Sequence, residues 1–107
     1  MEEAGNVLLV SSASIWEIAI KASRGKLHAP PDLMRVLDDQ GFISLSVSRD
    51  HAWRVHALPG DGRGDPFDRL LAAQALHEKL TVISGDRAFD EYGVDRLWSL
   101  SGETARP

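Results

Sequence analysis

The segment that most constrains the fold spans residues 64–86, where a helix with a marked start is followed closely by a strand. Asp65 is a residue type favoured at a helix N-cap, and Pro66 suits the first helical position. Apolar side chains at helical spacing would form the buried stripe of this helix: Phe67, Leu70, Leu71 and Ala75. Residues 81–84 are typical of a strand, so the segment predicts a helix packed on a sheet.

The same alternation extends through the rest of the chain. Short apolar runs predict strands at residues 7–10, 42–47 and 94–100. Helices are expected at residues 15–22, 32–40, 48–58 and 87–92, the first ending at Gly25 and the second at Gly41. The helix at residues 48–58 would turn Ala52, Trp53 and Val55 inward. Strands alternating with helices imply an α/β fold, in which a parallel sheet is covered by helices.

Composition narrows the class of protein. The 107 residues suit one domain, expected at residues 1–100 and followed by a loose tail at residues 101–107. The absence of cysteine excludes disulfides and a thiolate zinc site, which fits a cytoplasmic protein, and no apolar run is long enough to predict a membrane span. A net charge of −4 argues against binding nucleic acid by bulk charge, although a nuclease whose acidic cluster is neutralised by metal stays open.

Three carboxylates from separate segments are candidates for a shared site. Glu17 follows the first expected strand, Asp68 lies in the first turn of the helix that begins at Pro66, and Asp86 directly follows the strand at residues 81–84. Because the carboxyl ends of parallel strands form the functional edge of such a sheet, all three could converge there. Carboxylate oxygens are the ligands that Mg²⁺ and Mn²⁺ prefer, so the cluster predicts a divalent metal site suited to phosphodiester hydrolysis.

Each acid also has a structural interpretation. Glu17 stands three residues after Ser14, the spacing of a capping box, and Asp68 stands in the same relation to Asp65. Asp86 would cap the short helix that follows it. Other acids, Asp90 and Asp95, are expected at the surface, and the four histidines show no metal-ligand spacing with one another. Three acids on one sheet edge favour a metal site over three independent caps.

Three sequence blocks resemble the PIN-domain ribonucleases, and specifically the VapC-type toxins of toxin–antitoxin pairs. They are "SSASIWEIAIKASRGKL", "DPFDRLLAAQA" and "TVISGDRAFDEYGV", and they occur in the family's order over residues 7–98. The resemblance implies a three-layer α/β/α sandwich, cleavage of RNA with Mg²⁺ or Mn²⁺, inhibition by a cognate antitoxin and, in many members, a homodimer. It also implies that Glu17, Asp68 and Asp86 match the family's acidic site residues.

The chain departs from the family pattern at its start. The family's first strand, which carries an aspartate in a pattern like "LLDTH", has no counterpart in this sequence. By resemblance, that strand would lie centrally in the sheet, between the strands at residues 7–10 and 81–84. Its loss would expose strand edges and remove a metal ligand, so the sequence predicts a truncated or start-miscalled toxin with weakened or absent turnover. Direct pairing of the two flanking strands, or a strand from another chain, are alternatives.

Three hypotheses follow from the sequence. The first is a metal-dependent endoribonuclease toxin whose partners are RNA and an antitoxin. The second is a non-catalytic remnant or interaction module that retains only the antitoxin-binding surface. The third is an unrelated small α/β domain in which all the acids are helix caps.

Overall fold

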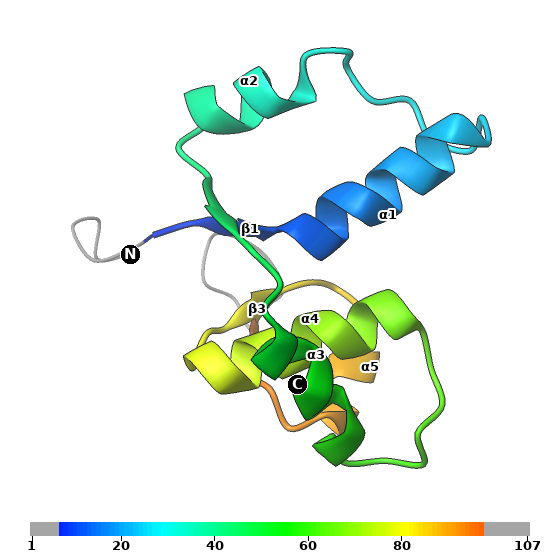
Figure 1. Ribbon diagram of the computed structural model, residues 1–107, viewed down its shortest axis with the longest axis vertical. Helices are drawn as coiled ribbons and strands as arrows, with labels where there is room; N and C mark the ends of the chain where they lie inside the picture. The colour runs from blue at the N-terminus through cyan, green and yellow to red at the C-terminus, as the bar shows by residue number, and fades with distance from the viewer. Residues whose placement is uncertain (1–6, 98–107) are drawn as a thin grey trace. The chain divides into compact units, whose positions relative to one another are not determined.

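The computed structural model describes residues 7–97, which form two compact units, one up to Val47 and one from Ser48 onward (Figure 1). The end of the strand expected at residues 94–100, Trp98 and the tail at residues 101–107 lie outside the described residues. Each unit has its own short parallel sheet and its own helices. The expectation of one domain over residues 1–100 stays a prediction.

The first unit consists of β1 (Leu9–Ser11), α1 (Ser12–Ser23), α2 (Leu33–Asp39) and β2 (Ile43–Leu45). β1 and β2 pair in parallel, with Leu9 opposite Ile43 and Ser11 opposite Leu45. Both helices end where the sequence predicts, since Gly25 and Gly41 follow them with φ of 71° and 87°, a conformation that favours glycine. The helices are therefore delimited by local chemistry.

The second unit consists of α3 (Arg49–Arg54), a 3₁₀ turn η2 (Val55–Ala57), α4 (Pro66–Glu78), β3 (Val82–Ile83), α5 (Ala88–Glu91) and β4 (Arg96–Leu97). β3 and β4 pair in parallel, Val82 with Arg96 and Ile83 with Leu97. The hydrophobic core lies between α4 and the segments around it, and its buried members are Leu58, Ala72, Ala73, Ala75, Phe89, Tyr92 and Val94. Alanines on the buried face of α4 let the neighbouring segments approach closely.

α3 lies against α4 (Figure 1). His51, early in α3, contacts Glu78 at the end of α4, whereas the carbonyl of Val55 accepts a hydrogen bond from Arg69 near the start of α4. The face that α3 turns toward α4 is not the one the sequence suggested. His51 is buried, while Ala52 and Trp53 are exposed and only Val55 packs against the core.

The expected alternation of helices with parallel strands is confirmed at the level of an α/β fold. The strands are shorter than expected, and each sheet has two of them within the described residues. β1 pairs with β2 and β3 pairs with β4. The direct pairing of β1 with β3 that the sequence left open stays a prediction. A three-layer sandwich stays a prediction.

Candidate functional site

Glu17 lies on α1 of the first unit, and its role as a capping residue was predicted wrongly. α1 begins three residues earlier than expected, because the Ser11 hydroxyl caps it by accepting a hydrogen bond from the Ala13 amide at 3.0 Å. Glu17 therefore lies in the second turn and instead pairs with Lys21, with 3.1 Å between Oε2 and Nζ. Its side chain is 24% exposed. A partly exposed ion pair of this spacing contributes only a few tenths of a kcal/mol, so the carboxylate can exchange Lys21 for a metal cation at little cost.

Asp68 lies in the first turn of α4, next to the residue that caps that helix. Asp65 is the N-cap, as predicted, and its Oδ1 accepts hydrogen bonds from the amides of Phe67 at 2.7 Å and Asp68 at 3.2 Å. Because Asp65 satisfies these first-turn amides itself, the cap does not require the Asp68 carboxylate. Asp68 is half-buried in the first turn of α4, at the positive end of the helix dipole.

Asp86 follows β3 directly and is exposed. Its amide donates to the Ser84 hydroxyl at 3.0 Å, and its Oδ1 accepts a hydrogen bond from the Ala88 amide at 2.9 Å. One oxygen thus bonds the first amide of α5, although the N-cap of that helix is Arg87 and not Asp86. The other oxygen, Oδ2, makes no hydrogen bond to any of residues 7–97, so this carboxylate has an oxygen open for a cation.

Tyr92 connects the α5 segment to the start of α4. The side chain is buried, and its hydroxyl lies so close to Gly64 that a Cβ at that glycine would be 2.6 Å from it. Burial raises the pKa of Tyr92, the carboxylate of Asp68 adds to that rise and Arg69 opposes it. The start of α4 and the segment that follows β3 are therefore packed together in the second unit.

Arg96 braces the turn that carries Asp86, and the sequence gave no indication of this role. Its side chain is 1% exposed and binds Asp90 with both ends of the guanidinium, at 3.0 Å from Nε to Oδ1 and 2.8 Å from Nη2 to Oδ2. Nη1 donates to the Ser84 carbonyl at 3.2 Å. The hydrogen bonds to Asp90 raise the pKa of Arg96, and Asp86 contributes to the rise. Asp90, expected at the surface, is instead the partner of a buried cation.

Arg69, the neighbour of Asp68, holds the glycine-rich loop that precedes α4. Its Nη1 donates to the Gly62 carbonyl, and its Nη2 donates to the Val55 carbonyl at 3.2 Å. The buried Nε has no hydrogen-bond partner. The loop is thus fixed to both η2 and α4.

A second polar cluster brings His51, His77 and Glu78 together, with ligand atoms within 4.8 Å of one another. The backbone amide of Ser48 donates to His51 Nδ1 at 3.0 Å, so in the neutral ring the proton is on Nε2, which donates to Glu78 Oε2 at 2.8 Å. Neither nitrogen has a lone pair left for a metal ion. The cluster is a hydrogen-bonded clasp between α3 and α4, and its Glu78 lies about 15 Å along α4 from Asp68.

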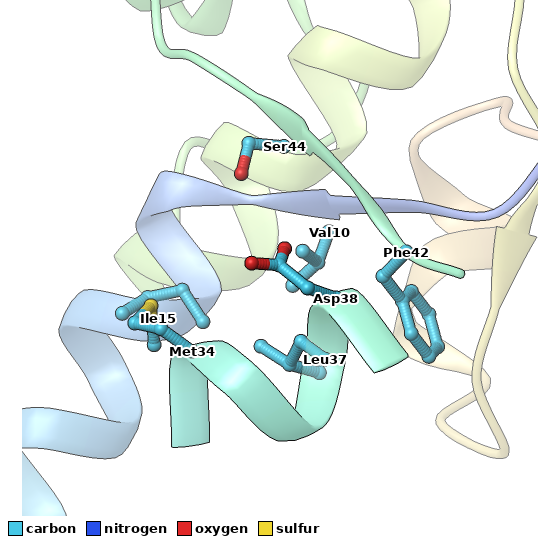
Figure 2. Close-up of a pocket in the computed structure, with 7 residues that line it drawn as sticks. All are labelled: Val10, Ile15, Met34, Leu37, Asp38, Phe42 and Ser44. Atoms are coloured by element: carbon cyan, nitrogen blue, oxygen red, sulfur yellow. The ribbon is translucent and has the colours of Figure 1, made fainter. Parts of the chain in front are cut away.

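The first unit contains a pocket of about 150 Å³ between its sheet and helices (Figure 2). The side chains that converge on it come from β1, α1, α2 and the segment through β2, and they are Val10, Ile15, Met34, Leu37, Asp38, Phe42 and Ser44. None of the three candidate carboxylates lines it. The pocket is mostly apolar and offers one carboxylate, that of Asp38.

Comparison with protein families gives one match, to the PIN domain, over residues 1–95. The chain belongs to the PIN-domain family. No curated protein and no solved structure gave a significant match. PIN domains are generally nucleases, many are toxins of toxin–antitoxin pairs, and they typically bind divalent metals.

Membership of the PIN-domain family supports the α/β fold and the nuclease class that the sequence predicts. Within the described residues, no helix has the length and apolar character needed to cross a membrane. Asp68 and Asp86 belong to the second unit, and Glu17 belongs to the first. The convergence of all three carboxylates stays a prediction.

Proposed function

We propose that this PIN domain is a metal-dependent endoribonuclease of the VapC type, a cytoplasmic toxin that cleaves RNA and is inhibited by a cognate antitoxin. The observation that carries the proposal is the family match over residues 1–95. It is supported by Asp68, whose carboxylate the cap of α4 does not require, and by Asp86, whose Oδ2 accepts no hydrogen bond from residues 7–97. Glu17 supports it further, because the cap that would have explained this residue belongs to Ser11.

The proposed ligands of Mg²⁺ or Mn²⁺ are Glu17, Asp68 and Asp86. Three carboxylates supply hard oxygen donors, the donor set that these ions prefer. The fit is supported by the free Oδ2 of Asp86 and by the weak, exchangeable pairing of Glu17 with Lys21. When bound, the metal would polarise the scissile phosphodiester and lower the pKa of an attacking water.

The protein's own groups would orient this chemistry. The Arg96 side chain fixes the Ser84 carbonyl and thereby the turn that presents Asp86. Tyr92, whose phenol is neutral at physiological pH and whose pKa burial raises further, packs the α5 segment against the start of α4 without adding charge beside Asp68. Arg69 holds the glycine-rich loop next to that carboxylate.

The experiment measures cleavage of a structured RNA in Mn²⁺ by the parent and by three variants, Glu17→Ala, Asp68→Ala and Asp86→Ala. Loss of cleavage in each variant, with the fold retained by circular dichroism, supports the nuclease. Asp95→Ala, an exposed carboxylate outside the proposed site, is the matched control and should cleave like the parent. Cleavage that survives all three substitutions would contradict the ligand assignment.

The sequence holds no segment like "LLDTH", so this chain supplies three carboxylates where the family pattern has a further aspartate. We expect three ligands alone to bind Mn²⁺ weakly and to cleave RNA slowly. A synthetic peptide with the family's first-strand pattern should then restore cleavage when added in trans. The same peptide with asparagine in place of the aspartate should not restore it.

A binding role without catalysis is the second candidate. The first unit exposes large apolar side chains within its described residues, among them Val7, Trp16, Met34 and Ile43. Such a surface suits a protein partner, either the antitoxin or a second copy of the chain. Metal-independent capture of the antitoxin by a protein that never cleaves RNA would favour this role.

A further inference from the structure

Trp53 is displayed on the surface of the second unit, contrary to the inward position that the sequence suggested. The side chain is 73% exposed. The ring of His56 lies against it, with ring centroids 4.4 Å apart and planes inclined by 40°. An indole exposed to water contributes little of the free energy that its large apolar surface would supply if buried. Its exposure on α3 therefore calls for an explanation.

A hydrogen bond to the backbone holds the stacked rings of Trp53 and His56 in place. His56 Nδ1 bonds the Trp53 carbonyl, and because a carbonyl only accepts, Nδ1 carries the proton. His56 Nε2 therefore accepts hydrogen bonds when the ring is neutral and donates them when the ring is protonated. The result is a fixed aromatic surface with an adaptable polar edge.

Cationic side chains accompany the stack along the same face. Arg49 lies one turn before Trp53, and His56 lies one turn after it, at the i, i+4 and i+7 positions that share a helix face. Arg49 and Arg54 are both exposed, and neither forms an ion pair with any of residues 7–97. Asp50 is the acidic residue of this helix, so the local charge is positive.

The stack stands at the end of α3–η2 that adjoins the start of α4. Val55, between Trp53 and His56, accepts the hydrogen bond of Arg69, which is the neighbour of Asp68. His51, at the other end of α3–η2, contacts Glu78 at the far end of α4. An RNA strand that reaches Asp68 would therefore have the Trp53–His56 stack within a few nucleotides along its length.

The surroundings of Trp53 suit a nucleobase better than a protein partner. Among residues 48–97, the exposed large apolar side chains are Trp53 and Ile83, so the indole has no apolar patch around it. A protein hot spot is normally an aromatic anchor surrounded by other apolar contacts. An isolated ring flanked by free arginines is instead the arrangement that binds unpaired bases and phosphates.

We propose that Trp53 and His56 form a stacking platform for an unpaired base of single-stranded RNA, with Arg49 contacting the adjoining phosphate. The proposal deepens the proposed function by assigning a substrate subsite outside the metal ligands. Bases in a duplex are stacked on one another and cannot lie on the indole, so the platform selects unpaired RNA.

The test is a binding measurement in EDTA, where metal-dependent cleavage cannot occur. Fluorescence anisotropy follows a fluorescein-labelled 12-nucleotide oligouridine, and a labelled RNA duplex of the same length serves as the second probe. Trp53→Ala should weaken oligouridine binding about tenfold, and Trp53→Phe should recover most of the loss. Arg49→Gln should lower the salt slope by about one. Ile83→Ala, which removes the other exposed large apolar side chain of residues 48–97, is the matched control and should bind like the parent.

Each outcome decides the proposal separately from the nuclease. If oligouridine binding depends on Trp53 but neither the parent nor any variant cleaves RNA in Mn²⁺, the proposed nuclease is contradicted and the stacking platform is supported. Cleavage with a Trp53→Ala affinity equal to that of the parent would overturn the platform alone. It is also overturned if the parent binds no oligouridine, if it prefers the duplex, or if Trp53→Ala abolishes only self-association or antitoxin capture.

Discussion

Replacing His51 should destabilise the protein by an amount that its contacts allow us to work out. The imidazole is 3% exposed and joins three groups: the Ser48 amide, the Gln74 side-chain amide and Glu78. In His51→Ala the buried Gln74 side-chain amide loses its hydrogen bond to the ring, at about 1.5 kcal/mol. The Ser48 amide is near solvent, so the loss of its hydrogen bond contributes less to the destabilisation. The cavity left by the ring contributes about 1 kcal/mol. The total is about 3 kcal/mol, or roughly 15 °C in Tm for a domain of this size.

A graded series separates the contacts of His51. In His51→Asn, the side-chain carbonyl can replace Nδ1 as the acceptor for the Ser48 amide, so the cap of α3 is retained. The loss is then the hydrogen bond to Glu78, whose side chain is 43% exposed, and should be about 1 kcal/mol or less. Glu78→Gln keeps an acceptor for Nε2 and should cost still less.

Urea unfolding followed by circular dichroism gives the free energy of unfolding for each member of the series. We expect the order of stability parent, Glu78→Gln, His51→Asn, His51→Ala. Zn²⁺ should not stabilise the parent, because His51 has no lone pair to offer. A His51→Ala protein as stable as the parent would refute the clasp. So would a Zn²⁺ stabilisation that disappears in His77→Ala, because that result would make the cluster a metal site.

Three further predictions concern the second unit, which carries Asp68 and Asp86. Asp65→Ala removes the cap of α4 and should lower the free energy of unfolding by about 1 kcal/mol in urea melts, while leaving Mn²⁺ binding measurable by calorimetry. Gly64→Ala and Gly60→Ala both force alanine to positive φ, but only Gly64→Ala meets the Tyr92 hydroxyl. It should therefore be less stable than Gly60→Ala by about 1 kcal/mol, and Tyr92→Phe should narrow that difference. The pKa of Tyr92 is raised in the fold above its ordinary 10.0, so its contribution is fully present below pH 10 and is lost as the pH rises through the folded value. Thermal unfolding measured from pH 8 to 11 should show an alkaline loss of stability that is smaller in Tyr92→Phe, and equal losses would contradict this assignment.

Elements with local stop and start signals could be predicted from the sequence. Asp65 and Pro66 fix the start of α4, and Gly25 and Gly41 fix the ends of α1 and α2, because each acts through its own backbone conformation or through amides a few residues away. The start of α1 was predicted wrongly, because the sequence offers more than one residue that could cap it. Several serines precede that helix, and only the backbone at Ser11 decides which of them is the cap.

Features that depend on distant contacts could not be predicted. The burial of His51 and the exposure of Trp53 are set by which face of α3 meets α4, and a six-residue helix has too short an apolar pattern to define that face. Arg96 gave no signal, because its partners Asp90 and Ser84 come from other elements. The positions of Asp68 and Asp86 beside the ends of their own elements were local and followed from the sequence.

The central claim is that Glu17, Asp68 and Asp86 hold the same divalent ion. Paramagnetic broadening by substoichiometric Mn²⁺ tests it directly in ¹⁵N-labelled protein, since amides within roughly 15 Å of the ion lose their NMR signals first. We predict that the amides of all three residues broaden together and that Asp86→Ala abolishes the effect at Glu17 as well as at Asp68. Broadening confined to Glu17, or to the pair Asp68 and Asp86, would contradict the shared site.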